Sequence, residues 1–172
     1  MFNVKKATND CIQWIRDWRE ENGPGCNLIV GISGGVDSLV AAELCVEAVG
    51  ADKVLGVIMP NYKQDDIDVA YDICQHVLGI DYLTINVGSA YDDIIDQIDA
   101  AFNVTDQTLI NLAPRLRMAT LYGVSQSHNG RVVNTCNLSE DYIGYSTRYG
   151  DAAGDFSPLA QFTKSEVKRI GY

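Results

Sequence analysis

The chain has 172 residues, of which 47% are hydrophobic and 21% charged, a composition typical of one globular domain with a sizeable core. Its formal net charge of -10 argues against a broad nucleic-acid surface, because such a surface needs cationic patches. No apolar run approaches the roughly 20 residues of a membrane span, and five widely spaced cysteines without a Cys-x-x-Cys pair predict reduced, mostly buried thiols in a cytoplasmic protein.

Helical and strand patterns alternate along the chain. Apolar residues at helical spacing predict a helix over residues 4–20, and the continuous apolar run of residues 28–32 predicts a strand buried on both faces. A turn at residues 33–35 leads into a predicted helix over residues 36–49, which ends at Gly50. The later elements are expected in the order strand 54–59, helix 65–78, strand 82–87, helices 91–102 and 108–127, and strand 131–135.

This alternation predicts an α/β fold, with an open parallel sheet that carries helices on both faces in a Rossmann-like three-layer sandwich. Ligands of such sheets bind at the carboxyl ends of the strands. Residues 31–38, 59–63 and 135–140 each follow a predicted strand, so we expect them to meet in one crevice. Thr163 and Glu166 have the spacing of a capping box, which predicts a last helix.

One segment between the first predicted strand and its helix has the features of a phosphate-binding turn. Its small residues let backbone N–H groups approach an anion, and the following helix directs its positive end to the same place. Its aspartate would repel a polyphosphate, but it fits if it binds Mg²⁺ that bridges to phosphate oxygens. The alternative is an ordinary helix start in which Asp and Ser cap free amides. The segment reads Gly31-Ile32-Ser33-Gly34-Gly35-Val36-Asp37-Ser38.

Residues 31–38 resemble the loop of the ATP pyrophosphatase superfamily, whose members adenylate an oxygen of their substrate and release pyrophosphate. With the motifs downstream, the chain resembles the ammonia-dependent NAD synthetases over nearly its whole length. The resemblance implies an adenine nucleotide alpha hydrolase-like fold, ATP as co-substrate, and Mg²⁺. The downstream motifs are Asn111-Leu112-Ala113-Pro114-Arg115-Leu116-Arg117-Met118, Asn134-Thr135-Cys136-Asn137-Leu138-Ser139-Glu140, Gly144-Tyr145-Ser146-Thr147-Arg148-Tyr149-Gly150-Asp151, Asp155, Pro158-Leu159 and Thr163-Lys164.

The reaction of that family is a ligation that forms a carbon–nitrogen bond. The carboxylate of deamido-NAD (nicotinic acid adenine dinucleotide) attacks the α-phosphate of ATP and pyrophosphate leaves. Ammonia then attacks the activated carbonyl, which yields NAD and AMP. Free ammonia is the expected donor, because the chain has neither room nor motif for an amidase domain that would release it from glutamine.

The resemblance also implies roles for individual residues. We expect ATP to contact residues 31–38 together with Met59, Thr135 and Lys164, and Mg²⁺ to be held by Asp37 and Glu140. Asp37 and Lys164 would serve catalysis, because fixed positive charge must offset the charge that builds on the phosphates. The dinucleotide would contact Arg115, Arg148 and Asp155. Apart from the resemblance, we expect substrate contacts from Asn111 and from Tyr122 and Tyr145, whose rings can stack on adenine or the pyridine ring.

Simpler interpretations of these residues stay open. Glu140 could be a solvated loop carboxylate, and most of the nine tyrosines must pack in the protein or lie at its surface. Arg115 and Arg117 are two positions apart and point to different sides of a helix, so we expect one of them, Arg115, to contact a ligand. The family commonly carries Lys where this chain has Arg148, which keeps the charge but alters the contact.

The family forms two-fold dimers, so the resemblance implies a homodimer. Candidate interfaces are the opening helix with Trp14 and Trp18 and the helix that carries residues 115–122. Family members continue past the helix that begins at Thr163, and we expect residues 1–172 to form one domain that lacks the family's C-terminal segment. Two other functions stay open: another adenylating ligase of the ATP pyrophosphatase type, and a truncated, catalytically silent nucleotide-binding module.

Overall fold

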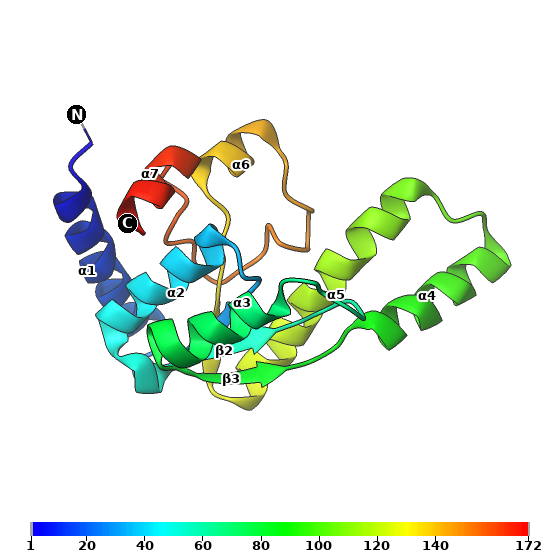
Figure 1. The fold of residues 1–172 in the computed structure, drawn as a ribbon, viewed down its shortest axis with the longest axis horizontal. Helices are drawn as coiled ribbons and strands as arrows, with labels where there is room; N and C mark the ends of the chain where they lie inside the picture. The colour runs from blue at the N-terminus through cyan, green and yellow to red at the C-terminus, as the bar shows by residue number, and fades with distance from the viewer. Residues whose placement is uncertain (1, 172) are drawn as a thin grey trace.

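The computed structural model of the protein describes residues 2–171. The sheet at the centre of the fold consists of four parallel strands in the order β3-β2-β1-β4 (Figure 1). Val30 of β1 is paired with Gly56 of β2 and with Val133 of β4, so β1 is hydrogen-bonded on both sides. The strands span Asn27–Gly31 (β1), Val54–Ile58 (β2), Asp81–Thr84 (β3) and Gly130–Val133 (β4).

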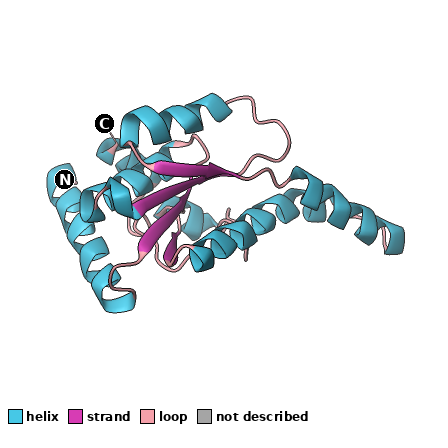
Figure 2. Ribbon diagram, turned by 90° about the horizontal axis from the view of Figure 1, so that it is seen from below, coloured by secondary structure: helices cyan, strands magenta, loops and turns pink. Residues whose placement is uncertain are grey.

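Helices cover both faces of the sheet and make three layers (Figure 2). Leu28 and Val30 of β1 are buried in the cluster that includes residues of α1, α2 and α7, whereas Ile29 packs with α5 on the opposite face. Burial on both faces explains why β1 is continuously apolar. The helices are α1 (Val4–Asn22), α2 (Val36–Val49), η1 (Ala51–Lys53), α3 (Ile67–Asp72), η2 (Ile73–Leu78), α4 (Gly88–Ala101), α5 (Asp106–Ser127), α6 (Leu138–Ile143) and α7 (Lys164–Ile170).

Residues 88–110, which we call the arm, extend away from the sheet (Figures 1 and 2). They comprise α4, which packs on α5, and the first turn of α5 itself, while the rest of α5 contacts β1 and β4. Thr105 caps α5, because its Oγ1 accepts a hydrogen bond of 3.3 Å from Thr108 N. Phe102 and Ile110 are 74% and 66% exposed, so the arm carries apolar side chains that this chain does not cover.

The predicted α/β class, the parallel sheet and the helices on both faces are confirmed. The helix expected over residues 36–49 has these bounds in the structure. The helix expected over residues 65–78 is present from Ile67 to Leu78, and its second half, from Ile73, is a π-helix. The wider turn places Cys74 Sγ over Gly56 of β2, where a Cβ would lie 3.0 Å from the sulfur.

Two strands end earlier than predicted because polar side chains turn the backbone. Asn86 Oδ1 accepts hydrogen bonds from Tyr62 N and Gly88 N, at 3.1 and 2.9 Å, and the strand expected to reach residue 87 ends at Thr84. The strand expected over residues 131–135 ends at Val133, and Asn134 Nδ2 donates to the backbone of residues 151 and 153. The sequence analysis did not predict α6, which is too short for a periodic pattern.

Two expectations from composition can be compared with the structure. All five cysteines are buried and free, as predicted. Burial raises the pKa of Cys11 and of Cys74 to about 11, because a buried thiolate loses its solvation, so these thiols are protonated packing groups. Within residues 2–171, no helix combines the length and apolarity needed to cross a membrane.

Candidate functional site

A cavity of about 480 Å³ opens where β1, β2 and β4 end. The three segments that the sequence analysis expected at the carboxyl ends of the strands all contribute to its wall. Gly34, Gly35 and Val36 complete the turn beside the cavity and are not among its lining residues. The predicted site residues that do line it are Gly31, Ile32, Ser33, Asp37, Ser38, Met59, Thr135 and Glu140.

Serine hydroxyls hold the glycine turn that follows β1. Ser38 Oγ donates to the Gly35 carbonyl at 2.9 Å and lies 3.2 Å from Ser33 Oγ, which accepts from Gly35 N at 3.2 Å. The φ angle of Gly34 is 87°, a conformation that favours glycine. No side chain caps α2 at Gly35, so the N–H groups of its first turn are open to an anion. Of the Asp and Ser that the alternative interpretation expected to cap amides here, Ser33 and Ser38 accept from the amides of Gly35 and Ser33, whereas Asp37 is bonded elsewhere.

Asp37 is instead held by two side chains from distant parts of the chain. The Lys164 ammonium, at the start of α7, pairs with Asp37 Oδ2 and lies 3.8 Å from Glu140 Oε1. Asn137 Nδ2 donates to Asp37 Oδ1 at 3.1 Å. The Asp37 side chain is 17% exposed, so its pairing is less screened by water than a surface ion pair. The structure thus brings Asp37, Glu140 and Lys164 together, and we call these three residues the charged cluster.

The short helix α6 positions Glu140 within this cluster. The fully buried Asn137 caps α6 by accepting hydrogen bonds from Ser139 N and Glu140 N, and Glu140 Oε2 accepts in return from Asn137 N at 3.2 Å. This capping box leaves Glu140 Oε1 on the side of Lys164. Lys164 N donates to Ser139 Oγ at 3.1 Å, which links the starts of α6 and α7.

The residues predicted to contact the dinucleotide lie outside the cavity lining, and all of them except Tyr145 fall into two groups. In the first group, α5 meets the loop that follows α6. Thr147 Oγ1 donates to Asn111 Oδ1 at 2.8 Å, and Arg115 Nε donates to the Arg148 carbonyl at 3.2 Å. The guanidinium of Arg148 lies over the ring of Tyr149, 4.8 Å from its centroid. Both arginines are exposed at this edge of the molecule.

The second group joins α5 to β4. The Tyr122 hydroxyl donates to Asp155 Oδ1 at 3.3 Å, and Asp155 Oδ2 accepts from Val132 N at 2.7 Å. Burial raises the pKa of Tyr122, and the Asp155 carboxylate adds to this increase. Tyr145 belongs to neither group, because it lies 81% exposed in the loop after α6. The structure does not bring these three residues to the charged cluster.

Sequence reasoning missed several residues of the cavity wall, among them Arg117, Gln64 and Asp151. Arg117 Nε donates to the Met59 carbonyl at 2.8 Å, and Gln64 Nε2 donates to the Ser33 carbonyl at 3.0 Å. Burial lowers the pKa of the Arg117 guanidinium, and the charge of Asp151 opposes this decrease. The sequence showed that Arg115 and Arg117 face different sides of a helix, but not which side meets the cavity.

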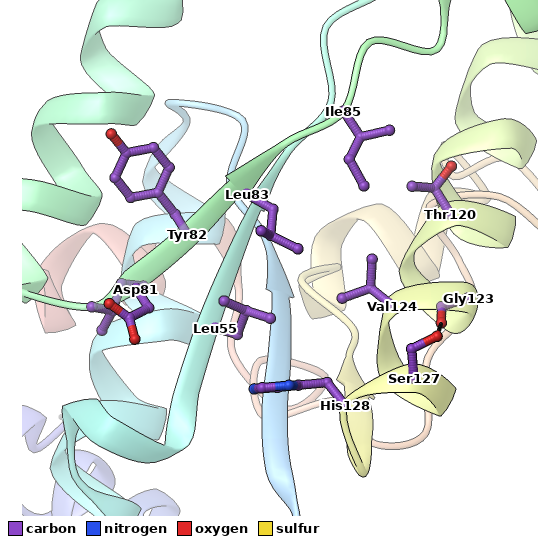
Figure 3. Close-up of a pocket in the computed structure, with 11 residues that line it drawn as sticks. Leu55, Asp81, Tyr82, Leu83, Ile85, Thr120, Gly123, Val124, Ser127 and His128 are labelled. Atoms are coloured by element: carbon purple, nitrogen blue, oxygen red, sulfur yellow. Dashed lines mark hydrogen bonds between the residues drawn. The ribbon is translucent and has the colours of Figure 1, made fainter.

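A second hollow, of about 800 Å³, lies between strands β2 and β3 and the C-terminal half of α5 (Figure 3). Much of its wall is apolar, and none of the predicted site residues lines it. We call it the apolar groove. It is lined by Leu55, Ile80, Asp81, Tyr82, Leu83, Ile85, Thr120, Gly123, Val124, Ser127 and His128.

Asp37 and Glu140 are suitable ligands for Mg²⁺. Protein sites for this ion commonly use one or two carboxylates, with phosphate oxygens and water completing the coordination. Asp37 and Glu140 both lie beside the ammonium of Lys164, so they are close enough to share one cation. Within residues 2–171 there is no group of three or more His, Cys, Asp or Glu side chains placed to hold a metal.

The fold and the cavity define a class of protein: a parallel α/β domain whose site lies at the carboxyl ends of its strands, with a glycine turn and an uncapped helix start beside the cavity. A family model described as NAD synthase matches residues 7–171. The chain belongs to the NAD synthase family.

Individual relatives agree with this assignment. The chain is 41% identical over 169 residues to the NH(3)-dependent NAD(+) synthetase of Thermococcus kodakarensis, an alignment that covers 98% of this chain and 65% of the relative. The chain thus spans less than two thirds of that relative's length. Among solved structures, the NMN synthetase from Francisella tularensis is similar to this chain, with a TM-score of 0.90 and 32% sequence identity. The match covers 99% of this chain and 70% of the synthetase chain. The NH3-dependent NAD synthetase from Campylobacter jejuni, in complex with the nitrate ion, has a TM-score of 0.89 at 32% identity, with coverages of 98% and 72%.

Proposed function

We propose that this chain is a ligase that makes NAD from deamido-NAD, ATP and ammonia, with AMP and pyrophosphate as the other products. The observation that carries the proposal is the charged cluster of Asp37, Glu140 and Lys164 next to the glycine turn. Acidic ligands for a cation, a fixed ammonium and open helix amides are the groups that an adenylation needs in one place.

In the first step, the carboxylate of deamido-NAD attacks the α-phosphate of ATP and pyrophosphate leaves. Negative charge builds on the α-phosphate and on the leaving pyrophosphate, so hydrogen-bond donors and cations must be in place before the reaction. The amides at the start of α2 supply neutral donors, the hydroxyls of Ser33 and Ser38 hold the turn that presents them, and Lys164 supplies positive charge beside Asp37. The hydroxyl of Thr135 adds a donor from the wall at β4.

Mg²⁺, held by Asp37 and Glu140, would supply further positive charge to the phosphate oxygens. In the structure, the Lys164 ammonium lies beside both carboxylates, so neither is left unpaired in this partly buried place. Asn137 fixes the orientation of Asp37 through its amide hydrogen bond. The chain's own contribution to the metal site is thus two oriented carboxylates.

In the second step, ammonia attacks the activated carbonyl and AMP leaves. Water would hydrolyse the adenylate, so the site must exclude it. Pro114, Met118 and Leu121 of α5 line the cavity and present apolar surface to it. We place deamido-NAD at the adjoining edge, where Asn111, Arg115 and Arg148 meet, because a guanidinium can take a pair of phosphate or carboxylate oxygens.

A homodimer in which the arm of each copy lies in the apolar groove of the other is part of the proposal. Leu109 and Ile110 on the arm are 40% and 66% exposed, and Leu83 in the groove is 42% exposed. A two-fold contact would cover both apolar surfaces at once. This contact differs from the two interfaces expected from the sequence. The helix of residues 115–122 contributes Thr120 to the groove. On the opening helix, Trp14 is 43% exposed, but Trp18 stacks on Phe156 of its own chain, with ring centroids 4.3 Å apart.

The proposed location is the cytoplasm. The five cysteines are free and buried, which suits a reducing compartment. The acidic composition favours small-molecule substrates over nucleic acid, and we expect no membrane partner.

The test is product formation by the 172-residue chain with ATP, Mg²⁺, deamido-NAD and ammonium, with NAD and AMP measured in the same sample. Equal amounts of NAD and AMP, formed when both deamido-NAD and ammonium are present, are the expected result. Binding of ATP without product would identify a silent nucleotide-binding module. Amidation of nicotinic acid mononucleotide but not of deamido-NAD would reassign the substrate, an outcome that the similarity to an NMN synthetase makes worth measuring.

A further inference from the structure

We infer that Arg117 binds the phosphate groups of ATP, an inference that rests on the proposed function. Among the described residues that line the cavity, Arg117 is the one with a positively charged side chain, whereas Asp37, Glu140 and Asp151 are acidic. ATP would bring several more negative charges to this wall. A fixed guanidinium in the same cavity therefore offsets repulsion that the three carboxylates would otherwise cause.

A backbone hydrogen bond fixes the position of this guanidinium. Arg117 Nε donates to the Met59 carbonyl at 2.8 Å. Met59 directly follows β2, which pairs with β1 up to Gly31 and Val57, so the bond holds Arg117 near the strand end that carries the glycine turn. Because Nε makes this bond, the two terminal nitrogens of the guanidinium remain for a pair of phosphate oxygens.

The charge of Arg117 has no close partner within the described chain. No ion pair within 4.0 Å among residues 2–171 includes Arg117, and Asp151 acts on it from a longer distance. A partly buried cation without an adjacent anion is unfavourable. An anionic ligand in the cavity that Arg117 lines would remove this cost.

Arg19 shows what a purely structural contact of the same kind looks like. Its Nε donates to the Cys26 carbonyl at 2.8 Å, the same type of bond at the same length, and the contact is partly buried. Arg19 lies on α1 and does not line the cavity. Loss of either guanidinium removes a bond to a backbone carbonyl, so Arg19→Gln is a matched control for Arg117→Gln.

The test compares the unchanged chain with Arg117→Gln, Arg117→Lys and Arg19→Gln by titration calorimetry with Mg²⁺ and α,β-methylene-ATP, whose methylene bridge cannot be cleaved where pyrophosphate would leave. We expect Arg117→Gln to weaken binding by about tenfold or more, because a charge-assisted pair of hydrogen bonds is lost. The affinity of Arg117→Lys, which keeps the positive charge but lacks the paired terminal nitrogens of a guanidinium, should lie between those of the unchanged chain and Arg117→Gln. Arg19→Gln should bind like the unchanged chain.

Steady-state kinetics give a second measurement. Arg117→Lys should raise the KM for ATP while the KM for deamido-NAD stays unchanged. Unchanged affinity for the ATP analogue in both Arg117 variants, or an increase confined to the KM for deamido-NAD, would overturn the inference. If the unchanged chain itself does not bind the analogue, the proposed function fails first, and this result is distinct from a failure of Arg117 alone.

Discussion

At the scale of single residues, the orientation of Asp37 depends on side chains that follow it by 100 and 127 positions. Asn137 donates to one carboxylate oxygen and the Lys164 ammonium pairs with the other. Because both oxygens are engaged, the carboxylate is held in one orientation by its surroundings. The residue that the proposal assigns to Mg²⁺ is therefore in position before any substrate arrives.

The substitution Asp37→Asn should lower kcat by about a hundredfold or more, because the amide cannot hold the cation that offsets phosphate charge. Its amide oxygen can still accept from Asn137, so the thermal unfolding midpoint should change by only a few degrees. Asp10→Asn is the control, since it removes an exposed carboxylate paired with Lys6 on α1 and should leave turnover unchanged. Full turnover of Asp37→Asn at saturating Mg²⁺ would contradict the assigned role.

Residue-level prediction from the sequence depended on whether a contact is local. Asp37 was identifiable because its turn lies between a buried strand and a helix, and Glu140 and Lys164 followed from the family resemblance. The contact between Asn137 and Asp37 joins two distant segments, and no local pattern records it. Arg117 was missed because the rotation of α5 about its axis decides which arginine meets the cavity, and that rotation is fixed by packing against β1 and β4.

At the scale of elements, the capping box at the start of α7 holds the turn that carries Lys164. Glu166 Oε2 accepts hydrogen bonds from Thr163 N and Thr163 Oγ1, both at 2.9 Å. These bonds lower the pKa of the Glu166 carboxyl below 4.5, and the charge of Arg169 adds to the decrease. A folded-state pKa below the unfolded value means that ionised Glu166 stabilises the fold, and that this contribution disappears as the pH falls through the folded value.

Glu166→Gln should therefore lower the free energy of unfolding at about pH 7, with a difference from the unchanged chain that narrows once the pH falls well below 4.5. Urea unfolding at a series of pH values measures this difference. Glu43→Gln, at an exposed position in the middle of α2, is the control and should show no such narrowing. If the free energies of unfolding of Glu166→Gln and the unchanged chain differ by the same amount down to acid pH, then ionisation of the Glu166 carboxylate does not stabilise the fold.

Helices and strands were predictable where their apolar residues form a clear pattern, either a continuous run or a regular spacing. The continuous apolar run of β1 and the apolar spacing of α2 identify both elements, because each is buried against the same core cluster. The change to a π-helix at Ile73 has no counterpart in the apolar spacing of residues 65–78, which predicts a helix but not its hydrogen-bond pattern. The short helix α6 left one local signal, the spacing of Asn137 and Glu140, which matches a capping box.

At the scale of the whole molecule, the strand order explains the place of the cavity. The chain leaves β1 toward β2 on one side, and β4 lies on the other side of β1, so the connections diverge between β1 and β4. Such a divergence leaves a crevice at the carboxyl ends of the strands. Ser33 of the turn after β1 lines this crevice, and so do Thr135 and Glu140 of the segment after β4. The sequence predicted the parallel sheet but not its order, which depends on contacts between distant strands.

The arm and the apolar groove are two apolar surfaces that the single chain leaves exposed, and the proposed dimer can be tested on both. Ile110→Glu and Leu83→Glu each place a charge where an apolar contact is expected, so both variants should be monomeric in sedimentation experiments in which the unchanged chain is dimeric. Val77→Glu, at a 56% exposed site on η2 outside the arm and the groove, should remain dimeric. If Ile110→Glu dissociates the dimer and Leu83→Glu does not, the arm has another binding surface, and a dimer that survives both changes would exclude this interface.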